Sequence, residues 1–214
     1  MISDTIHIYY ALIDPGMPDH VFFTYLHQLP SALHPDILKY HRRADQVRTL
    51  TGKLLMQEAI TQAGFSPASM NAILYTDYKR PYIAEHFDFN ITHSGCCVAC
   101  CAGFGMKLGI DVEELHPITA DDITTVFRAE ELEAMRNAPP ETILHFWTRK
   151  EAIVKASGQG LYMQPQEIYF IDRLTARTAS QQWWLYEVNV GAGYLCYCAS
   201  DAPGREIVMK EMKY

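Results

Sequence analysis

The chain has 214 residues, of which 18 are Lys or Arg and 25 are Asp or Glu, so its formal net charge is −7. With 49% hydrophobic and 20% charged residues, it is neither a disordered nor a collagen-like chain, and its length allows one large domain or two small ones. The negative balance argues against a protein whose whole surface binds nucleic acid. No stretch reaches the roughly 18 apolar residues of a membrane span, and no signal-peptide pattern opens the chain. We therefore expect a cytoplasmic protein that binds neither nucleic acid nor a membrane.

The first half of the chain alternates between extended and helical patterns. Apolar residues at every second position predict a strand over 6–12, and the Pro- and Gly-containing stretch 15–18 then breaks it. Helices are expected over 19–29 and 36–63, with Gly64 ending the second. Short strands are predicted at 72–75 and in the cysteine-rich run 96–103.

The second half repeats this order. A strand is predicted at 108–113, helices at 121–127, 129–137 and 142–157, and strands at 167–171, 183–190 and 194–200. Both halves thus run from a strand through helices to strands. We expect an α+β fold of two pseudo-twofold related lobes, residues 1–105 and 106–214, with the active site at their interface.

Six cysteines raise the alternative of a metal protein. Cys97 and Cys100 have the CxxC spacing of zinc ligands. On a strand, however, residues three apart point to opposite faces, so these two would not converge on one ion. No second CxxC is present, because Cys196 and Cys198 are two apart. Reduced, buried cysteines that act as small hydrophobic residues are the favoured interpretation.

Two acidic residues stand out on the strand at 108–113. Asp111 and Glu113 are two apart, so their side chains leave the same face. Two neighbouring carboxylates repel each other unless a cation or a proton intervenes. The plain alternative is a solvated strand end.

The helix at 142–157 carries a second set of polar residues. Trp147, Glu151 and Lys155 are spaced i, i+4, i+8 and share one face. An ordinary surface ion pair between Glu151 and Lys155 is the alternative. Joined to Asp111 and Glu113, Glu151 would complete a site of three carboxylates suited to Mg²⁺. Lys155 would then serve the same phosphate-rich ligand.

Two further stretches are candidates for binding an anion. Residues 90–95 (NITHSG) read as a polar turn that offers Thr92, His93 and backbone N–H groups, although a lone His in a turn is usually just exposed. Five of the 18 Lys and Arg residues lie between 39 and 53, among them Arg48. Gly52 in that helix is useful if another element packs closely against it.

Together these stretches resemble the 4′-phosphopantetheinyl transferase superfamily, in its two-lobed, surfactin-synthetase-activating class. The matching strings are NITHSG at 90–95, GIDVE at 109–113 and FWTRKEAIVKASGQGL at 146–161. Weaker matches are RRADQVRTLTGK at 42–53 and YKRPYI at 78–83. The resemblance implies an enzyme that moves the phosphopantetheine arm of coenzyme A onto a serine of an acyl or peptidyl carrier protein and releases adenosine bisphosphate.

The resemblance also implies roles for individual residues. Asp111, Glu113 and Glu151 correspond to the family's magnesium ligands, and Lys155 to its lysine near the pyrophosphate. Thr92 and His93 correspond to residues that contact the phosphates of the coenzyme. Arg48 corresponds to an arginine near the ribose phosphate, and Arg80 with Pro81 to a basic residue and proline near the adenine. Further lysines that often precede the basic helix are replaced here by residues 34–36 (HPD).

We expect catalysis to depend on Asp111, Glu151 and Lys155, with Glu151 as the base that accepts the proton of the carrier serine, directly or through a metal-bound water. Two other functions use the same residues. A magnesium-dependent nucleotide hydrolase is disfavoured because GxxxxGK[ST] is absent. A non-catalytic module that binds coenzyme A or carrier protein would not need the three acids and Lys155 together. Two lobes in one chain could complete a site without a partner, so we expect a monomer.

Overall fold

The structure, a computed structural model, describes residues 4–84 and 86–214. Residues 1–3, part of the N-terminal stretch considered for a signal peptide, lie outside the described residues. The helices are α1 (Asp19–Leu26), α2 (His34–Leu38), α3 (Arg43–Gln62), α4 (Ala129–Met135) and α5 (Pro140–Ser157). Short 3₁₀ turns lie at Ser31–Leu33, Pro67–Ala72, Ala120–Val126, Gly160–Tyr162 and Pro165–Glu167. Within the described residues, no helix combines the length and the apolar character needed to cross a membrane.

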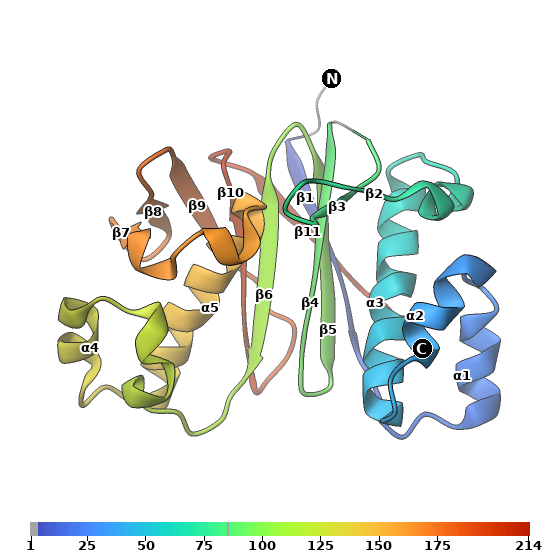
Figure 1. The fold of residues 1–214 in the computed structure, drawn as a ribbon, viewed down its shortest axis with the longest axis horizontal. Coiled ribbons are helices and arrows are strands. Elements are labelled where there is room, and N and C mark those ends of the chain that lie inside the picture. Colours follow the sequence, from blue (N-terminus) through green and yellow to red (C-terminus); the bar gives the residue numbers. More distant parts are fainter. Residues whose placement is uncertain (1–3, 85) are drawn as a thin grey trace.

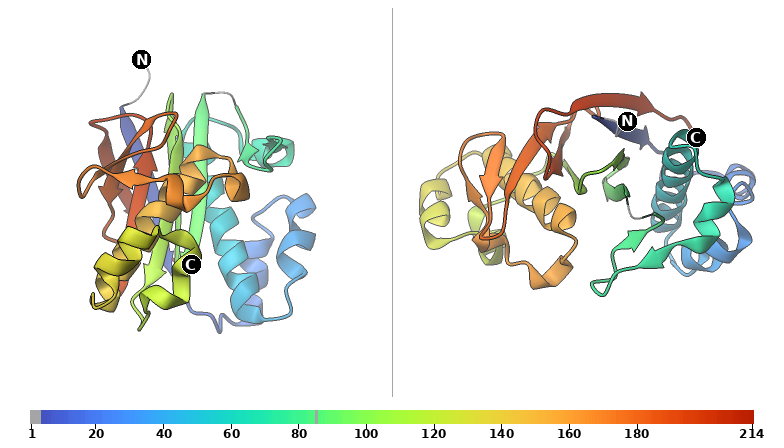
Figure 2. Two further views of the ribbon diagram at one scale, coloured as in Figure 1. Left: turned by 60° about the vertical axis from the view of Figure 1, so that its left-hand side comes forward. Right: turned by 90° about the horizontal axis from the view of Figure 1, so that it is seen from above.

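Two main sheets form the middle of the molecule. The strands are β1 (Thr5–Leu12), β2 (Leu74–Tyr75), β3 (Pro81–Tyr82), β4 (Phe87–Ser94), β5 (Cys97–Phe104), β6 (Leu108–Glu114), β7 (Tyr169–Phe170), β8 (Thr175–Arg177), β9 (Gln182–Glu187), β10 (Tyr194–Ser200) and β11 (Glu206–Glu211). One sheet has the order β11-β1-β5-β4, the other β6-β10-β9-β8-β7, and β2 pairs with β3. Helices α1 to α3 flank the strands on one side, and α4 and α5 on the other (Figures 1 and 2). The predicted α+β class with two sheet-containing lobes is confirmed.

The first sheet separates two hydrophobic cores. Strand β5 shows the alternation: Val98, Cys100 and Ala102 face the core beneath α3, whereas Cys97 and Cys101 face the core shared with the second sheet. Cys97 and Cys100 therefore point to opposite faces, as predicted, and all six cysteines are free thiols. Gly52 of α3 is buried, and a Cβ there would lie 3.2 Å from the side chain of Ile91 on β4.

The second sheet packs against α5. Ala152, Ile153 and Ala156 of the helix lie in one core with Trp183 and Tyr197 of the sheet. At Gly109, the helix backbone comes so near to β6 that a Cβ would lie 2.2 Å from the carbonyl oxygen of Ala152. A side chain at this position would push α5 away, so glycine is what allows the helix to rest directly on the strand.

Side chains of β4 join the two sheets. Strands β4 and β6 belong to different sheets, yet backbone N–H groups of β6 donate to polar side chains at every second position of β4. The four bonds are Leu108 N to Asp88 Oδ2 (2.7 Å), Ile110 N to Asn90 Oδ1 (3.0 Å), Val112 N to Thr92 Oγ1 (3.3 Å) and Glu114 N to Ser94 Oγ (3.0 Å). We call this set the side-chain ladder. It takes the place of a backbone ladder at the seam between the lobes.

Three expectations from the sequence need correction. Residues 90–94, predicted as part of a polar turn, belong to strand β4, because their polar side chains are turned toward β6. The single helix predicted over 36–63 is wrong: α2 ends at Leu38 and α3 begins at Arg43. The residue before α3, Arg42, is extended. The segment at 121–127 is a 3₁₀ turn in which Ile123 has non-helical backbone angles.

The last strand returns to the first sheet. β11 pairs parallel to β1, with Ile6 opposite Ile207 and Tyr10 opposite Glu211. A strand from the second half of the sequence thus completes the sheet of the first half. The predicted division at residues 105 and 106 stays a prediction.

Candidate active site

The predicted acidic pair lies on the face of β6 that is turned toward α5 and the seam. Asp111 is buried, with 5% of its surface exposed. Lys155 of α5 donates from Nζ to Asp111 Oδ1 at 2.6 Å and to Thr92 Oγ1 at 3.1 Å. The structure therefore brings together three residues that are widely separated in the sequence, Thr92, Asp111 and Lys155, as expected for one site.

The other oxygen of Asp111 is the unusual atom in this cluster. Asp111 Oδ2 is buried and has no hydrogen-bond partner. A buried oxygen of a carboxylate without a partner is costly, since water no longer solvates it. A cation bound at this position would remove that cost.

Burial also shifts the acid–base behaviour of the acidic residues. Burial raises the pKa of Asp111 to about 7; Lys155 acts against this rise, and Glu113 and Glu151 add to it. Burial raises the pKa of Glu151 as well, while Lys155 lowers it and Glu113 raises it. The site thus holds more negative charge than Lys155 alone compensates.

Glu113 is fixed by two neutral donors. The indole Nε1 of Trp147 donates to Glu113 Oε1 at 2.8 Å, and Ser94 Oγ donates to Glu113 Oε2 at 3.0 Å. These two partners were not predicted as functional residues. The signals in the sequence were the position of Trp147 on the face of α5 shared with Glu151 and Lys155, and the place of Ser94 in the polar stretch 90–95.

The residues fit a hard divalent cation in their chemistry. All three candidate ligands, Asp111, Glu113 and Glu151, are carboxylates, which suit Mg²⁺, and the unpaired Asp111 Oδ2 is available. Among the residues that the structure describes, no three His, Cys, Asp or Glu side chains are already grouped closely enough to hold a metal ion.

His93 and Arg48 lie at the end of the site near the turn between β4 and β5. Arg48 donates from Nε to the carbonyl oxygen of Gly95 at 2.8 Å and pairs through Nη1 with Asp45 at 2.9 Å. The His93 residue is exposed. Desolvation lowers its pKa, and the charges of Arg48 and Lys155 lower it further. His93 is thus near both cations, which places positive charge where an anion could bind.

The other basic residues of 39–53 are not all gathered at this site. Lys39 pairs with Asp36 at 3.4 Å, and Arg43 pairs with Asp19. Burial lowers the pKa of Lys53. Two of these four cations, Lys39 and Arg43, are thus already paired with acids of α2 and α1.

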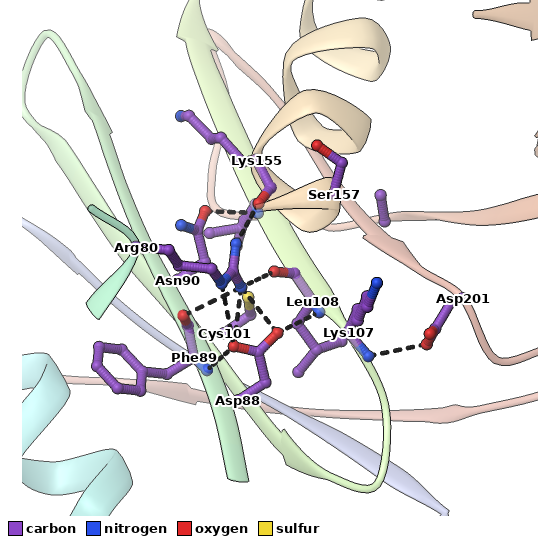
Figure 3. A network of polar contacts seen from close by, with 12 residues as sticks. Arg80, Asp88, Phe89, Asn90, Cys101, Lys107, Leu108, Lys155, Ser157 and Asp201 are labelled. Atoms are coloured by element: carbon purple, nitrogen blue, oxygen red, sulfur yellow. Dashed lines mark hydrogen bonds and ion pairs between the residues drawn. The ribbon is translucent and has the colours of Figure 1, made fainter. Parts of the chain in front are cut away.

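Arg80, but not Pro81, lines a large cleft. Pro81 begins β3, and Arg80 lies on the loop before it, with its guanidinium turned inward onto protein acceptors (Figure 3). The cleft has a volume of about 950 Å³ and lies between residues 75–84 and the end of α5, with Ser157 and Gly158 on its wall. Its wall thus begins within one helical turn of Lys155.

Comparisons with known proteins agree with this geometry. Residues 107–199 match the family described as the 4′-phosphopantetheinyl transferase superfamily, and residues 17–104 match the family described as 4′-phosphopantetheinyl transferase, N-terminal. The two matches together cover most of both halves of the chain. The chain belongs to the 4′-phosphopantetheinyl transferase superfamily.

Individual relatives in this superfamily come from bacteria and fungi. The 4′-phosphopantetheinyl transferase gsp of Aneurinibacillus migulanus is 26% identical over 191 residues, which cover 85% of this chain and 80% of that protein. A 4′-phosphopantetheinyl transferase of Bacillus subtilis is 32% identical over 130 residues, which cover 58% of this chain and 57% of that protein. An L-aminoadipate-semialdehyde dehydrogenase-phosphopantetheinyl transferase of Schizosaccharomyces pombe is 27% identical over 163 residues, 66% of this chain and 63% of that protein. The resemblance read from the motifs is confirmed.

Proposed function

We propose that this protein transfers the 4′-phosphopantetheine arm of coenzyme A to a serine hydroxyl of an acyl or peptidyl carrier protein, in a magnesium-dependent reaction that releases adenosine bisphosphate. Its membership of the superfamily supports the transfer. The observation that carries the magnesium-dependent chemistry is the cluster at the seam. There, Lys155 Nζ lies 2.6 Å from Asp111 Oδ1, while Asp111 Oδ2 is buried and unpaired.

Asp111, Glu113 and Glu151 would hold the magnesium ion. When bound, the ion supplies polarisation of the phosphate under attack and neutralises charge on the leaving phosphate. The two bonds that Glu113 accepts from Trp147 and Ser94 fix one of these carboxylates before any ligand arrives. This preorganisation reduces the rearrangement needed on binding.

Lys155 and Glu151 carry the chemistry at the transferring phosphate. The ammonium of Lys155 is a point charge that can bind an oxygen of the transferring phosphate. Burial raises the pKa of Glu151 while no metal is bound, and a bound Mg²⁺ would act against this rise. Glu151 then takes the proton of the carrier serine as the serine oxygen attacks, directly or through a water.

Coenzyme A would lie along the seam. In this proposal, His93 and Thr92 contact its phosphates, and Arg48 contacts the ribose phosphate. The cleft of about 950 Å³ lined by Arg80 has room for the adenine end. The monomeric state and the cytoplasmic location stay predictions.

Mass spectrometry of apo-carrier proteins tests the proposal. After incubation with coenzyme A and Mg²⁺, we expect one serine of the carrier to gain the phosphopantetheine arm, with release of adenosine bisphosphate. A chelator, or the substitution Asp111→Ala, should abolish the product. Release of a nucleotide product without carrier would indicate the hydrolase instead. Binding of coenzyme A without any product would indicate the non-catalytic module.

A further inference from the structure

Arg80 forms the centre of a polar cluster that joins four segments of the chain. Its guanidinium donates from Nη2 to Asp88 Oδ1 (2.8 Å) and Oδ2 (2.7 Å) on β4, and to the carbonyl oxygen of Leu108 on β6 (2.6 Å). From Nη1 it donates to the carbonyl oxygen of Lys155, in the last turn of α5. Figure 3 shows these bonds converging from the loop, the two strands and the helix.

Asp88 completes the cluster from the opposite side. Its carboxylate accepts the bonds from Arg80, and its Oδ2 also accepts the backbone N–H of Leu108 at 2.7 Å. The first rung of the side-chain ladder and the ion pair with Arg80 are therefore made by the same group. The two side chains are largely buried, with 13% of Arg80 and 18% of Asp88 exposed, so water competes weakly for these bonds.

The cluster holds the backbone of Lys155, the residue proposed to bind the transferring phosphate. Lys155 is held through its backbone by Arg80 and extends its ammonium to Asp111 at 2.6 Å. The next glycine, Gly158, ends α5 with a positive φ of 72°, and a Cβ there would lie 3.0 Å from Cδ of Arg80. The end of α5 is thus pressed against the Arg80 side chain and bonded to it.

We propose that Arg80 and Asp88 are a positioning pair, which fixes the last turn of α5 on β4 and β6 and thereby sets the distance between Lys155 and Asp111. The proposal rests on the transferase function proposed above. It differs from the role of Arg80 implied by the resemblance, a contact with the coenzyme. Arg80 commits Nε, Nη1 and Nη2 to acceptors of the protein itself, so a ligand in the cleft meets a guanidinium that is already engaged.

Steady-state kinetics separates positioning from coenzyme binding. Three variants are compared: Arg80→Lys, Asp88→Asn and the double variant. Arg80→Lys keeps the positive charge but loses the several hydrogen bonds of the guanidinium. With saturating carrier protein and Mg²⁺, we expect each single variant to lower kcat by about 10- to 100-fold, because a displacement of about 1 Å costs that order in rate. The KM for coenzyme A should change by less than about 3-fold. The double variant should have a kcat no lower than that of the slower single variant, since each single substitution already breaks the same positioning pair.

Other results would overturn the proposal. If Arg80→Lys raises the KM for coenzyme A at unchanged kcat while Asp88→Asn behaves as wild type, Arg80 is a coenzyme ligand. If both single variants keep the wild-type kcat, catalysis does not depend on the Arg80–Asp88 pair and the positioning role is refuted. An inactive wild-type protein would refute the transferase function instead, and this outcome is distinct from both.

Two further variants distinguish a loss of positioning from a general loss of folding. Asp88→Glu keeps a carboxylate and should retain several-fold more kcat than Asp88→Asn; equal losses would contradict positioning by the ion pair. Glu58→Gln is the control, because Glu58 pairs with Lys210 at 2.7 Å and joins α3 to β11 by another ion pair. It should leave kcat and KM unchanged. A loss of kcat equal to that of Asp88→Asn would show that any broken ion pair suffices.

Discussion

The close approach of α5 to β6 makes a quantitative prediction for Gly109→Ala. The new Cβ would lie 2.2 Å from the carbonyl oxygen of Ala152 and 2.3 Å from the backbone nitrogen of Ala156. Ordinary van der Waals contact begins at 3.4 Å, and both neighbours are backbone atoms that cannot rotate away. The helix must therefore move from the strand by roughly 1 Å.

Such a shift affects both stability and activity. Overpacking of this kind costs about 3 kcal/mol, which for a chain of this length lowers Tm by about 6 to 12 °C. The same shift lengthens the 2.6 Å contact between Lys155 and Asp111, and we expect kcat/KM to fall by about 100-fold. Thermal unfolding and carrier labelling, the latter well below the variant's Tm, measure the two effects.

Gly103→Ala is the matched control, on β5. Its Cβ would first meet a methyl group of Leu108 at 3.2 Å, the end of a buried side chain that needs to give way by only a few tenths of an ångström. We expect a loss of about 1 kcal/mol or less and nearly normal activity. The reasoning is refuted if Gly109→Ala keeps kcat/KM within about twofold of wild type, or if both variants lose the same stability.

Three further predictions concern the acidic site and the thiols. Since burial raises the pKa of Asp111 to about 7 from an ordinary 3.8, the native state holds an extra proton between about pH 4 and 7. Asp111 should therefore make stability without divalent cations fall as pH rises through that window, by up to about 4 kcal/mol. Asp111→Asn should remove this part of the fall and leave the part that comes from Glu151, whose pKa burial also raises; parallel pH profiles of the melting temperatures of the two proteins would contradict it. Trp147→Phe deletes the donor to Glu113 and should cost about 1 to 2 kcal/mol in denaturant unfolding and lower kcat/KM; an unchanged variant would show that this bond is dispensable. A thiol reagent should label half-buried Cys96 before the five buried cysteines, as followed by peptide mass spectrometry, and rapid labelling of Cys198 would contradict the buried core.

Local periodicity was enough to predict which faces of β6 and α5 carry the candidate acidic residues. The period of two on a strand puts Asp111 and Glu113 on one face, and helical spacing puts Glu151 and Lys155 on one face of α5. The structure has both elements where the pattern predicts them. That the ammonium of Lys155 meets Asp111 depends on how α5 crosses β6, which no local pattern encodes.

The errors in the first half have physical causes. β4 was interpreted as a turn at 90–94 because its polar residues face β6, so the polar side of the strand is buried in bonds instead of solvated. The break between α2 and α3 lies at residues 39–42, which contain neither Gly nor Pro. No helix-breaking residue therefore marks the end of α2 in the sequence.

The role of Arg80 was beyond the reach of sequence patterns for a different reason. Its partners are distant in the chain: 75 residues separate Arg80 from the backbone oxygen of Lys155 that it binds. In the sequence, an arginine before a proline is equally compatible with a contact to a ligand and with a hydrogen bond inside the protein. Only the fold distinguishes the two, by placing acceptors around it.

The position of β11 has a consequence for the order in which the molecule can be completed during synthesis. β1 is the first strand of the described chain and β11 the last, and they are hydrogen-bonded partners. Until β11 leaves the ribosome, the outer edge of β1 carries unpaired backbone groups of the kind that recruit strands from other chains. The sheet of the first half therefore keeps an unpaired strand edge until the last strand is synthesised. When incomplete chains are crowded together, association between chains is expected through this lobe, although it is synthesised first.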